Sequence, residues 1–296
     1  MAVFKHAYKG YEGPLTPAWS RFLILPRYSI AELRRSRFYN MFFLASMLAP
    51  VIFALIIYIQ HNLSAVKLLD IRHLVEINAH FFLNFLGWQS MMVFFLAAFV
   101  GPGQISPDLA NGALPLYLAR PFSRAEYVLG KMSVLLILMS FMTWIPGLLL
   151  YILQGALEGN GWLWQNLRIA AAIFLASWIW ILLLSLLALA LSAWVKFKPL
   201  AGGLLFGVFF VAGGFAGAIN VTLRTHWGSL INLSHLIGAV WASLFEQPMH
   251  RGSGAVFFRA PAGEIPVWCC WVALLAICAF CLYVLSRKIR GAEVVR

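Results

Sequence analysis

The stretch "LRIAAAIFLASWIWILLLSLLALALSAWV", residues 167–195, contains a single charged side chain, that of Arg168. An α-helix needs about 20 apolar residues to cross the roughly 30 Å hydrocarbon core of a bilayer, so this stretch is long enough to span one. The whole composition agrees, because 62% of the residues are hydrophobic and 11% are charged, against roughly 45–50% and about 25% in a soluble domain. We therefore predict an all-α membrane protein.

Six apolar blocks of this kind follow one another along the chain. Their predicted bounds are 38–60, 78–100, 128–153, 167–195, 200–221 and 265–286. They predict a six-helix transmembrane domain over 38–286, preceded by an arm at 1–37 and followed by a tail at 287–296. The apolar run 22–25 is too short for a cleavable signal peptide, so we expect the first span to act as the insertion signal.

Lysine and arginine are distributed unevenly between the two sides that six spans define. The side that contains both termini carries 16 of the 22 basic residues. Such residues accumulate in short cytoplasmic segments. We therefore predict that both termini are cytoplasmic, that the connection 101–127 is a cytoplasmic loop, and that 222–264 is a long external segment.

Several other functions find no support in the motifs. Most of the net charge of +12 lies beside the spans, where membrane insertion accounts for it, so we expect no nucleic-acid binding. Gly130-Lys131 does not end a phosphate-binding P-loop, because position 125 is alanine and position 132 is methionine. The cysteines, all in the sixth block, and the histidines lack metal-ligand spacing. We predict no catalytic, cofactor-binding or metal site in this chain.

The arm ends in "PRYSIAELRRSRF", residues 26–38, which has the pattern of an amphipathic helix. Ser29 and Glu32 have the spacing of a capping box, while Ile30 and Leu33 are spaced for one helix face. The opposite face carries the arginines, so we predict a helix along the cytoplasmic membrane surface. The alternative is a charged flank of the first span.

The cytoplasmic loop contains "ISPDLANGALPLYLARPFSRAEYVLGK", residues 105–131, which predicts two helix starts. Ser106 is suited to be an N-cap with Pro107 at the first helical position, and Gly112 is suited to end that helix. Pro121 interrupts the chain before Ser123 and Glu126, which form a second capping box. The loop is therefore expected to be rigid.

The same loop resembles the connection between the second and third spans of type-2 ABC transporter permeases. The arm "IAELRRSRF", residues 30–38, resembles the helix that leads into their first span. The family commonly has glutamate where this chain has Asp108. The loop residues that carry the resemblance are Asp108, Gly112, Leu114, Leu116, Arg120, Pro121, Ser123, Arg124, Tyr127, Gly130 and Lys131.

The resemblance implies a permease subunit that forms a homodimer or heterodimer and is driven by a separate ATPase subunit. ATP and Mg²⁺ would be bound by that partner, and this chain would hold no cofactor. It also implies that the complex is an exporter in a bacterial inner membrane. No residue of the sequence identifies the substrate of this exporter. In the family, the arm and the loop dock on the ATPase, where Asp108, Arg120, Arg124 and Glu126 would offer exposed charges. The residues expected to couple this chain to the ATPase are Glu32, Arg34, Arg35, Asp108, Gly112, Arg120, Pro121, Ser123, Arg124 and Glu126.

Two features lie near the predicted external side. Glu76, His80 and Asn84 are four residues apart and would share one helix face, toward a wet cavity or a neighbouring helix. That face is a candidate for substrate contact along the transport pathway. The stretch "INLSHLIGAVWASLF", residues 231–245, is apolar but too short to span. It is expected to be re-entrant, to form an outer gate or to cover the surface.

The fifth block contains two pairs of glycines with the small-xxx-small spacing. These pairs, Gly203 with Gly207 and Gly213 with Gly217, let helices approach closely. They are candidates for packing within the chain, for the dimer seam or for the transport pathway.

Three other functions remain as alternatives. A secondary transporter or channel typically has ionisable residues in mid-span or inverted repeats with broken helices, and the predicted span centres are almost free of charge. An intramembrane enzyme needs a nucleophile and base or a set of metal ligands, and no such set stands out. A membrane scaffold of an envelope assembly is the third.

Overall fold

The computed structural model of the chain describes residues 18–62, 76–113, 123–159, 161–247 and 265–289. These residues form helices and connections, with no strand among them. Six helical segments in this described part are long and apolar enough to cross a membrane. The predicted all-α fold with six spans is therefore confirmed.

Three of the spans are built from two helices each. Span 1 consists of α2 (Arg37–Ser46) and α3 (Leu48–Asn62), and span 3 of α8 (Arg124–Met142) and α9 (Trp144–Glu158). In span 2, α5 (Ala79–Val100) continues into α6 (Pro102–Ala110). The other spans are α11 (Leu167–Trp194), α12 (Lys198–Leu223) and α14 (Val267–Lys288). Their bounds follow the six apolar blocks closely, except that span 2 continues through α6 to Ala110, beyond the predicted end at 100, and span 3 starts earlier and ends later than predicted.

Helix α11 lies at the centre of the bundle. Inside the protein, 72% of its most apolar stretch is buried, against 11% for span 1, 17% for α12 and 22% for α14. Its Trp180 is fully buried and donates from the indole to the carbonyl of Ser90 in α5. The core is thus formed by α5, α8, α9 and α11, and the more exposed spans surround it.

The break in span 1 is compensated by a side chain from a neighbouring span. In a bilayer, a backbone group released by a kink needs a partner inside the protein. The amide of Gln89, buried in α5, donates to the carbonyl of Ser46, where α2 ends. In span 3 the break coincides with Pro146, which has no N–H to donate, and the hydroxyl of Thr143 bonds back to Met139.

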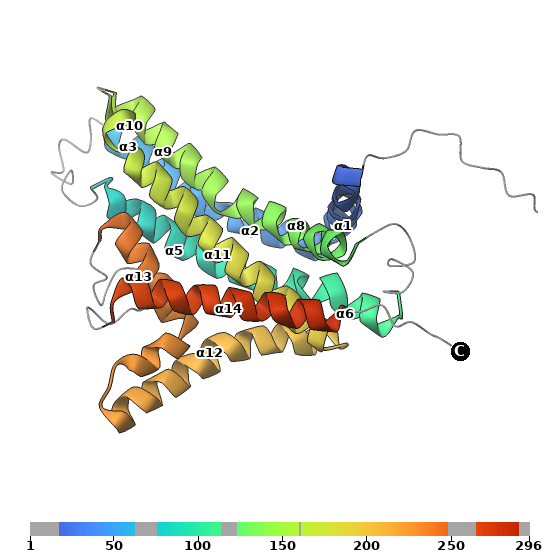
Figure 1. Cartoon of the computed structure of the whole chain (residues 1–296). Coiled ribbons are helices and arrows are strands. Elements are labelled where there is room, and N and C mark those ends of the chain that lie inside the picture. The colour runs from blue at the N-terminus through green and yellow to red at the C-terminus, as the bar shows by residue number, and fades with distance from the viewer. Residues whose placement is uncertain (1–17, 63–75, 114–122, 160, 248–264, 290–296) are drawn as a thin grey trace, which may run out of the picture.

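The two ends of the bundle differ, and we name them by a helix at each (Figure 1). The α6 end contains α1 (Ile24–Arg35), α6 and the start of α8. The α13 end contains α10 (Trp162–Gln165), the ends of α3 and α9, and most of α13 (Leu233–Phe245).

Helix α1 is amphipathic, as predicted, but it begins earlier. A 3₁₀-helix, η1 (Ala18–Leu23), runs directly into it, so Ser29 lies in the helix interior and is not an N-cap. The predicted capping box of Ser29 and Glu32 is therefore wrong. Pro26 is accommodated in the first turn, where its missing N–H would have had no intrahelical partner.

The segment between α12 and α14 folds back into the bundle. After Leu223 the chain turns into η3 (Trp227–Ile231), and the amide of Asn220 donates to the hydroxyl of Ser229 at 2.9 Å. Asn232 then lies against Gly213, ten residues before the end of α12, a depth of about 15 Å along a helix. From there α13 returns outward, and its buried Trp241 donates to the carbonyl of Ala176 in α11. Of the three expected roles, re-entrance fits this path.

Candidate functional site

Helix α6 begins at Pro102, about one and a half turns before Pro107, the predicted first helical position. A side-chain carbon added at Gly101 would lie 2.5 Å from the carbonyl oxygen of Ala97 and 2.6 Å from Cβ of Ala188, so only glycine fits there. The predicted N-cap at Ser106 is therefore wrong, and Pro107 lies inside the helix. The predicted end is confirmed, because Gly112 has a φ of +63° and the N–H of Ala113 bonds back to Asp108.

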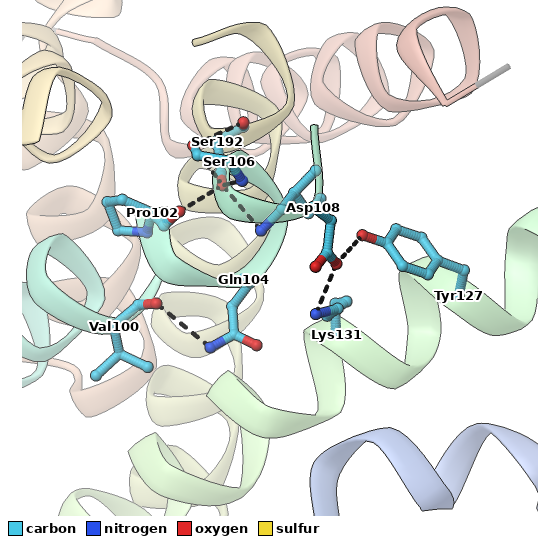
Figure 2. A network of polar contacts seen from close by, with 9 residues as sticks. Val100, Pro102, Gln104, Ser106, Asp108, Tyr127, Lys131 and Ser192 are labelled. Atoms are coloured by element: carbon cyan, nitrogen blue, oxygen red, sulfur yellow. Dashed lines mark hydrogen bonds and ion pairs between the residues drawn. The ribbon is translucent and has the colours of Figure 1, made fainter. Parts of the chain in front are cut away.

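One hydroxyl from α11 is inserted into the hydrogen-bond ladder of α6 (Figure 2). The hydroxyl of Ser192 donates to the carbonyl of Pro102 at 2.9 Å and accepts from the N–H groups of Ser106 at 2.9 Å and Ile105 at 3.1 Å. The Ser106 hydroxyl donates in turn to the carbonyl of Ser192 at 2.9 Å. Both serines are fully buried. Ser192 thus bridges the N–H and C=O that would otherwise bond to each other in an α-helix.

Asp108 connects α6 to α8 and does not offer a free charge. Its carboxylate accepts from the hydroxyl of Tyr127 at 2.6 Å and from the ammonium of Lys131 at 2.9 Å. The side chains of Asp108 and Lys131 are only 15% and 9% exposed, and Figure 2 shows all three groups converging between the two helices. The expectation that Asp108 is an exposed charge is therefore wrong. Tyr127 and Lys131 are one turn apart on α8, which lets both reach the same carboxylate.

The arm is seated on α8 at a glycine. A side-chain carbon at Gly130 would lie 2.7 Å from Cδ1 of Leu25 and 2.9 Å from the carbonyl oxygen of Phe22. The absence of a side chain therefore allows η1 and α1 to approach the helix closely. This contact explains the need for glycine at position 130, while the next residue, Lys131, faces α6.

Helix α12 packs against the start of α6 from another side. A side-chain carbon at Gly202 would lie 2.7 Å from the carbonyl oxygen of Ala98, near the end of α5, and 3.6 Å from Cγ of Pro102 in α6. One at Gly103 would lie 3.3 Å from the Lys198 ammonium in α12. Helix α6 is thus held by α8, α11 and α12. Sequence reasoning found neither Ser192 nor Gly202, because no local pattern distinguishes them from other small residues of an apolar span.

The second predicted helix start is confirmed. The hydroxyl of Ser123 accepts from the N–H of Glu126 at 3.2 Å, and the Glu126 carboxylate accepts from the N–H of Ser123 at 2.6 Å. Glu126 is therefore engaged in the cap, while Arg124 is exposed. Arg120 and Pro121 lie outside the described residues.

The charged residues of the arm point outward beside this helix start. Glu32, Arg34 and Arg35 are exposed, like Arg124. None of these four side chains forms a salt bridge with another residue in the part of the chain that the structure describes. The α6 end therefore combines a tightly packed interior with an outer surface whose charges are available.

The residues suggested for a pathway are not brought together with this site. Glu76 precedes Asn78, the N-cap of α5, so it does not share a helix face with His80 and Asn84 as predicted. His80 and Asn84 lie on the first turns of α5, at the α13 end. A side chain at Gly203, Gly207 or Gly217 would meet no atom within 4 Å, whereas Gly213 packs against Asn232. Of the four glycines, Gly213 is therefore the one that contributes to packing within the chain, and the other three lie on an open surface of α12.

Within the described residues, no group of three or more His, Cys, Asp or Glu side chains could hold a metal ion.

A family model described as "ABC-2 family transporter protein" matches residues 29–226 of the chain. The match includes α6 and the helix start at Ser123. Comparison with curated proteins gives no match.

Proposed function

This chain belongs to the ABC-2 family of transporters, and we propose that it is coupled to its ATPase subunit through the outer surface of the α6 end. Proteins of this family are membrane transport subunits and not enzymes by themselves. They generally work with an ABC ATPase subunit in the membrane. The chain is accordingly a multi-pass membrane permease, and the proposal concerns how it receives energy.

The support for coupling comes from the way α6 is fixed. Movement can be transmitted from one body to another only through a rigid contact. Helix α6 is joined to α11 by the Ser192 hydroxyl, to α8 by the Asp108 carboxylate and to α12 at Gly202. A displacement of α6 would therefore be passed on to spans 3, 4 and 5 together.

Recognition of the ATPase is assigned to the exposed charges. Glu32, Arg34 and Arg35 on α1 and Arg124 at the start of α8 present both signs of charge to a partner. Asp108, Gly112, Ser123 and Glu126 act differently, since they shape and brace the helices that carry this surface. Arg120 and Pro121 are assigned to the same connection by their place in the sequence.

The rest of the complex follows from the charge distribution and the family. The α6 end faces the cytoplasm, because 16 of the 22 basic residues belong to that side. ATP and Mg²⁺ are bound by the ATPase subunit, and the assembly exports its substrate across a bacterial inner membrane. A second permease chain, identical or related, packs on the open glycine face of α12, which includes Gly203, Gly207 and Gly217.

The test is purification of the complex from its native membranes. We expect the chain to copurify with an ATPase subunit, and we expect Mg²⁺-dependent ATP hydrolysis from the complex but not from the isolated chain. Replacing Arg34 and Arg35 by glutamate should reduce the amount of ATPase recovered, because the two charges are reversed on the docking surface. The matched control is Arg224→Glu at the α13 end, which should leave the recovery unchanged.

Two results would overturn the proposal. One is robust ATP hydrolysis by the isolated chain after contaminants are excluded. The other is full recovery of the ATPase and normal transport by the R34E/R35E variant, which would show that α1 makes no contribution to docking.

A further inference from the structure

An apolar slot lies between α12 and α14, with α11 as its floor. Its volume is about 460 Å³, within the roughly 300–1,000 Å³ of typical ligand pockets. Carbon atoms dominate its walls, which contain no charged side chain. The residues that line it are Leu187, Ala190, Leu191, Trp194, Val208, Ala212, Leu230, Ile231, Leu233, Ile277, Phe280, Cys281 and Val284.

The slot occupies the half of the membrane nearest the α6 end. On α14 its lining runs from Ile277 to Val284, about 10 Å along the helix axis, which is most of the roughly 15 Å of one leaflet. The re-entrant segment closes it toward the centre of the bundle, through Leu230, Ile231 and Leu233. At the other limit is Trp194, whose side chain is 63% exposed at the end of α11.

Basic residues surround the limit of the slot at the α6 end. Lys196 follows Trp194 by two residues, and Arg287 and Lys288 follow Val284 within little more than one helical turn. Figure 1 shows the end of α14 beside the turn between α11 and α12. All three basic side chains are exposed, and none forms a salt bridge within the described residues. An apolar slot that ends among cations matches a molecule with an apolar chain and an anionic head.

The slot is on a different side of α12 from the open glycines. Successive residues of an α-helix are separated by about 100° around its axis. Gly203, Gly214 and Gly217, where an added side-chain carbon would meet no atom within 4 Å, therefore gather on a face that points away from Val208 and Ala212. Gly207 lies at the edge of that face, where it lines a hollow together with Val208 and Ala212. A second copy that packs on the glycine face would leave the slot open to lipid.

We propose that this slot is a binding site for an anionic phospholipid of the leaflet at the α6 end. An acyl chain lies between α12 and α14 on the floor of α11, and the phosphate contacts Lys196 and Arg287. The site also joins the re-entrant segment to span 6, so an occupied slot stabilises the packing of η3 and α13. The inference does not depend on the ATPase or on the direction of transport.

The test uses the full chain purified in detergent and native mass spectrometry of the lipids that it retains. Phosphatidylglycerol and phosphatidylcholine with identical acyl chains are added in separate titrations. We expect the wild-type protein to bind phosphatidylglycerol more tightly. The double variant K196Q/R287Q should lose roughly tenfold or more of that affinity, since each basic side chain near an anionic surface contributes about fivefold. Its affinity for phosphatidylcholine should not change.

Two further variants separate the slot from the rest of the surface. Ala212→Phe fills the slot and should reduce the binding of both lipids, whereas Ala218→Phe, exposed on the same helix outside the slot, should reduce neither. The control for charge is R27Q/R224Q, which removes two cations elsewhere and should keep the preference for phosphatidylglycerol.

Three outcomes would overturn the proposal. The first is equal binding of the two lipids by the wild-type protein. The second is an unchanged preference in K196Q/R287Q, whose exposed substitutions should not disturb folding. The third is that Ala212→Phe alters the ratio of dimer to monomer but not lipid binding, which would show that a second copy occupies the slot.

Discussion

The hydroxyl of Ser192 is the hydrogen-bond partner of three backbone groups in another helix. It satisfies the carbonyl of Pro102 and the N–H groups of Ile105 and Ser106, all in α6. Buried backbone groups without a partner are costly, and this one side chain supplies a partner to all three. Asp108 has a comparable place, since its carboxylate is where α6 and α8 meet. The α6 end is therefore determined by a few polar atoms within an apolar bundle.

Replacing Ser192 by alanine should destabilise the protein by about 1–3 kcal/mol, because α6 loses a partner for buried backbone groups. The control is Ser185→Ala on the same helix, whose buried hydroxyl bonds only to the carbonyl of Leu182 in α11 itself and should matter much less. Thermal unfolding in detergent, followed by tryptophan fluorescence, measures both. Equal melting temperatures for the two variants would contradict the bridging role.

The contact between Asp108 and Lys131 can be measured by a double-mutant cycle of Asp108→Asn and Lys131→Met. We expect a coupling energy between the ~1 kcal/mol of an exposed ion pair and the ~3–5 kcal/mol lost on breaking a buried one. The control is the pair of Arg168 and Glu246, whose side chains are 54% and 67% exposed and whose coupling should be smaller. Additive effects at Asp108 and Lys131 would show that the pair does not brace α6.

At the scale of the elements, η1 and α1 pack closely on α8 at a single glycine. Most of the contact between the arm and the bundle is made with α8, and Gly130 is the point of closest approach. The apolar residues Leu25, Ile30 and Leu33 pack on the core, while the charges of α1 remain outside. The arm is thus an element whose amphipathic pattern is encoded locally and whose position is set by a glycine about a hundred residues away.

Gly130→Ala should loosen the arm, although alanine normally favours a helix by up to about 1 kcal/mol. The added methyl would lie 2.7 Å from Leu25 and 2.9 Å from the Phe22 carbonyl, so η1 and α1 must move. Limited trypsin digestion should therefore cut after Arg27 or Arg34 faster in this variant. The control Gly214→Ala, which meets no atom within 4 Å, should keep the wild-type rate. An unchanged rate in Gly130→Ala would mean that the arm is not held there.

The whole molecule has a braced α6 end and a re-entrant α13 end. At the α13 end the segment from η3 to α13 returns beside α12, and Trp241 reaches the middle of the bundle. The contacts of α6 with α8, α11 and α12 lie at the opposite end. The α6 end and the α13 end are connected by α11, which forms hydrogen bonds with Ser106 at one end and with Trp241 toward the other.

The orientation of the molecule follows from the same 16 of 22 basic residues and can be tested with introduced cysteines. The four natural cysteines, all in α14, are first replaced by serine. An impermeant thiol reagent added to sealed cells should then label Thr222→Cys at the α13 end, and should label Ser123→Cys only after permeabilisation. The reverse pattern would place the α6 end outside the cell and exclude a cytoplasmic partner there.

The sequence by itself determined the features that depend on neighbouring residues or on the length of a bilayer. The six spans could be predicted because the thickness of the hydrocarbon core sets the length of each apolar block. The cap at Ser123 and the helix end at Gly112 could be predicted because their partners lie within a few residues. The amphipathic face of α1 was visible for the same reason, and so was the family resemblance of the loop.

The tertiary structure decided which of several acceptable local patterns was used. Ser106-Pro107 and Gly101-Pro102 both suit a helix start, and the fit of Gly101 against Ala188 together with the Ser192 hydroxyl favoured the second. Asp108 is a residue type that is usually exposed at the surface, but here its carboxylate is bound between the helices by the Tyr127 hydroxyl and the Lys131 ammonium. Ser106 and Ser192 are 86 positions apart, and only packing reveals such a contact, because the free energy that selects it comes from satisfying buried polar groups between helices.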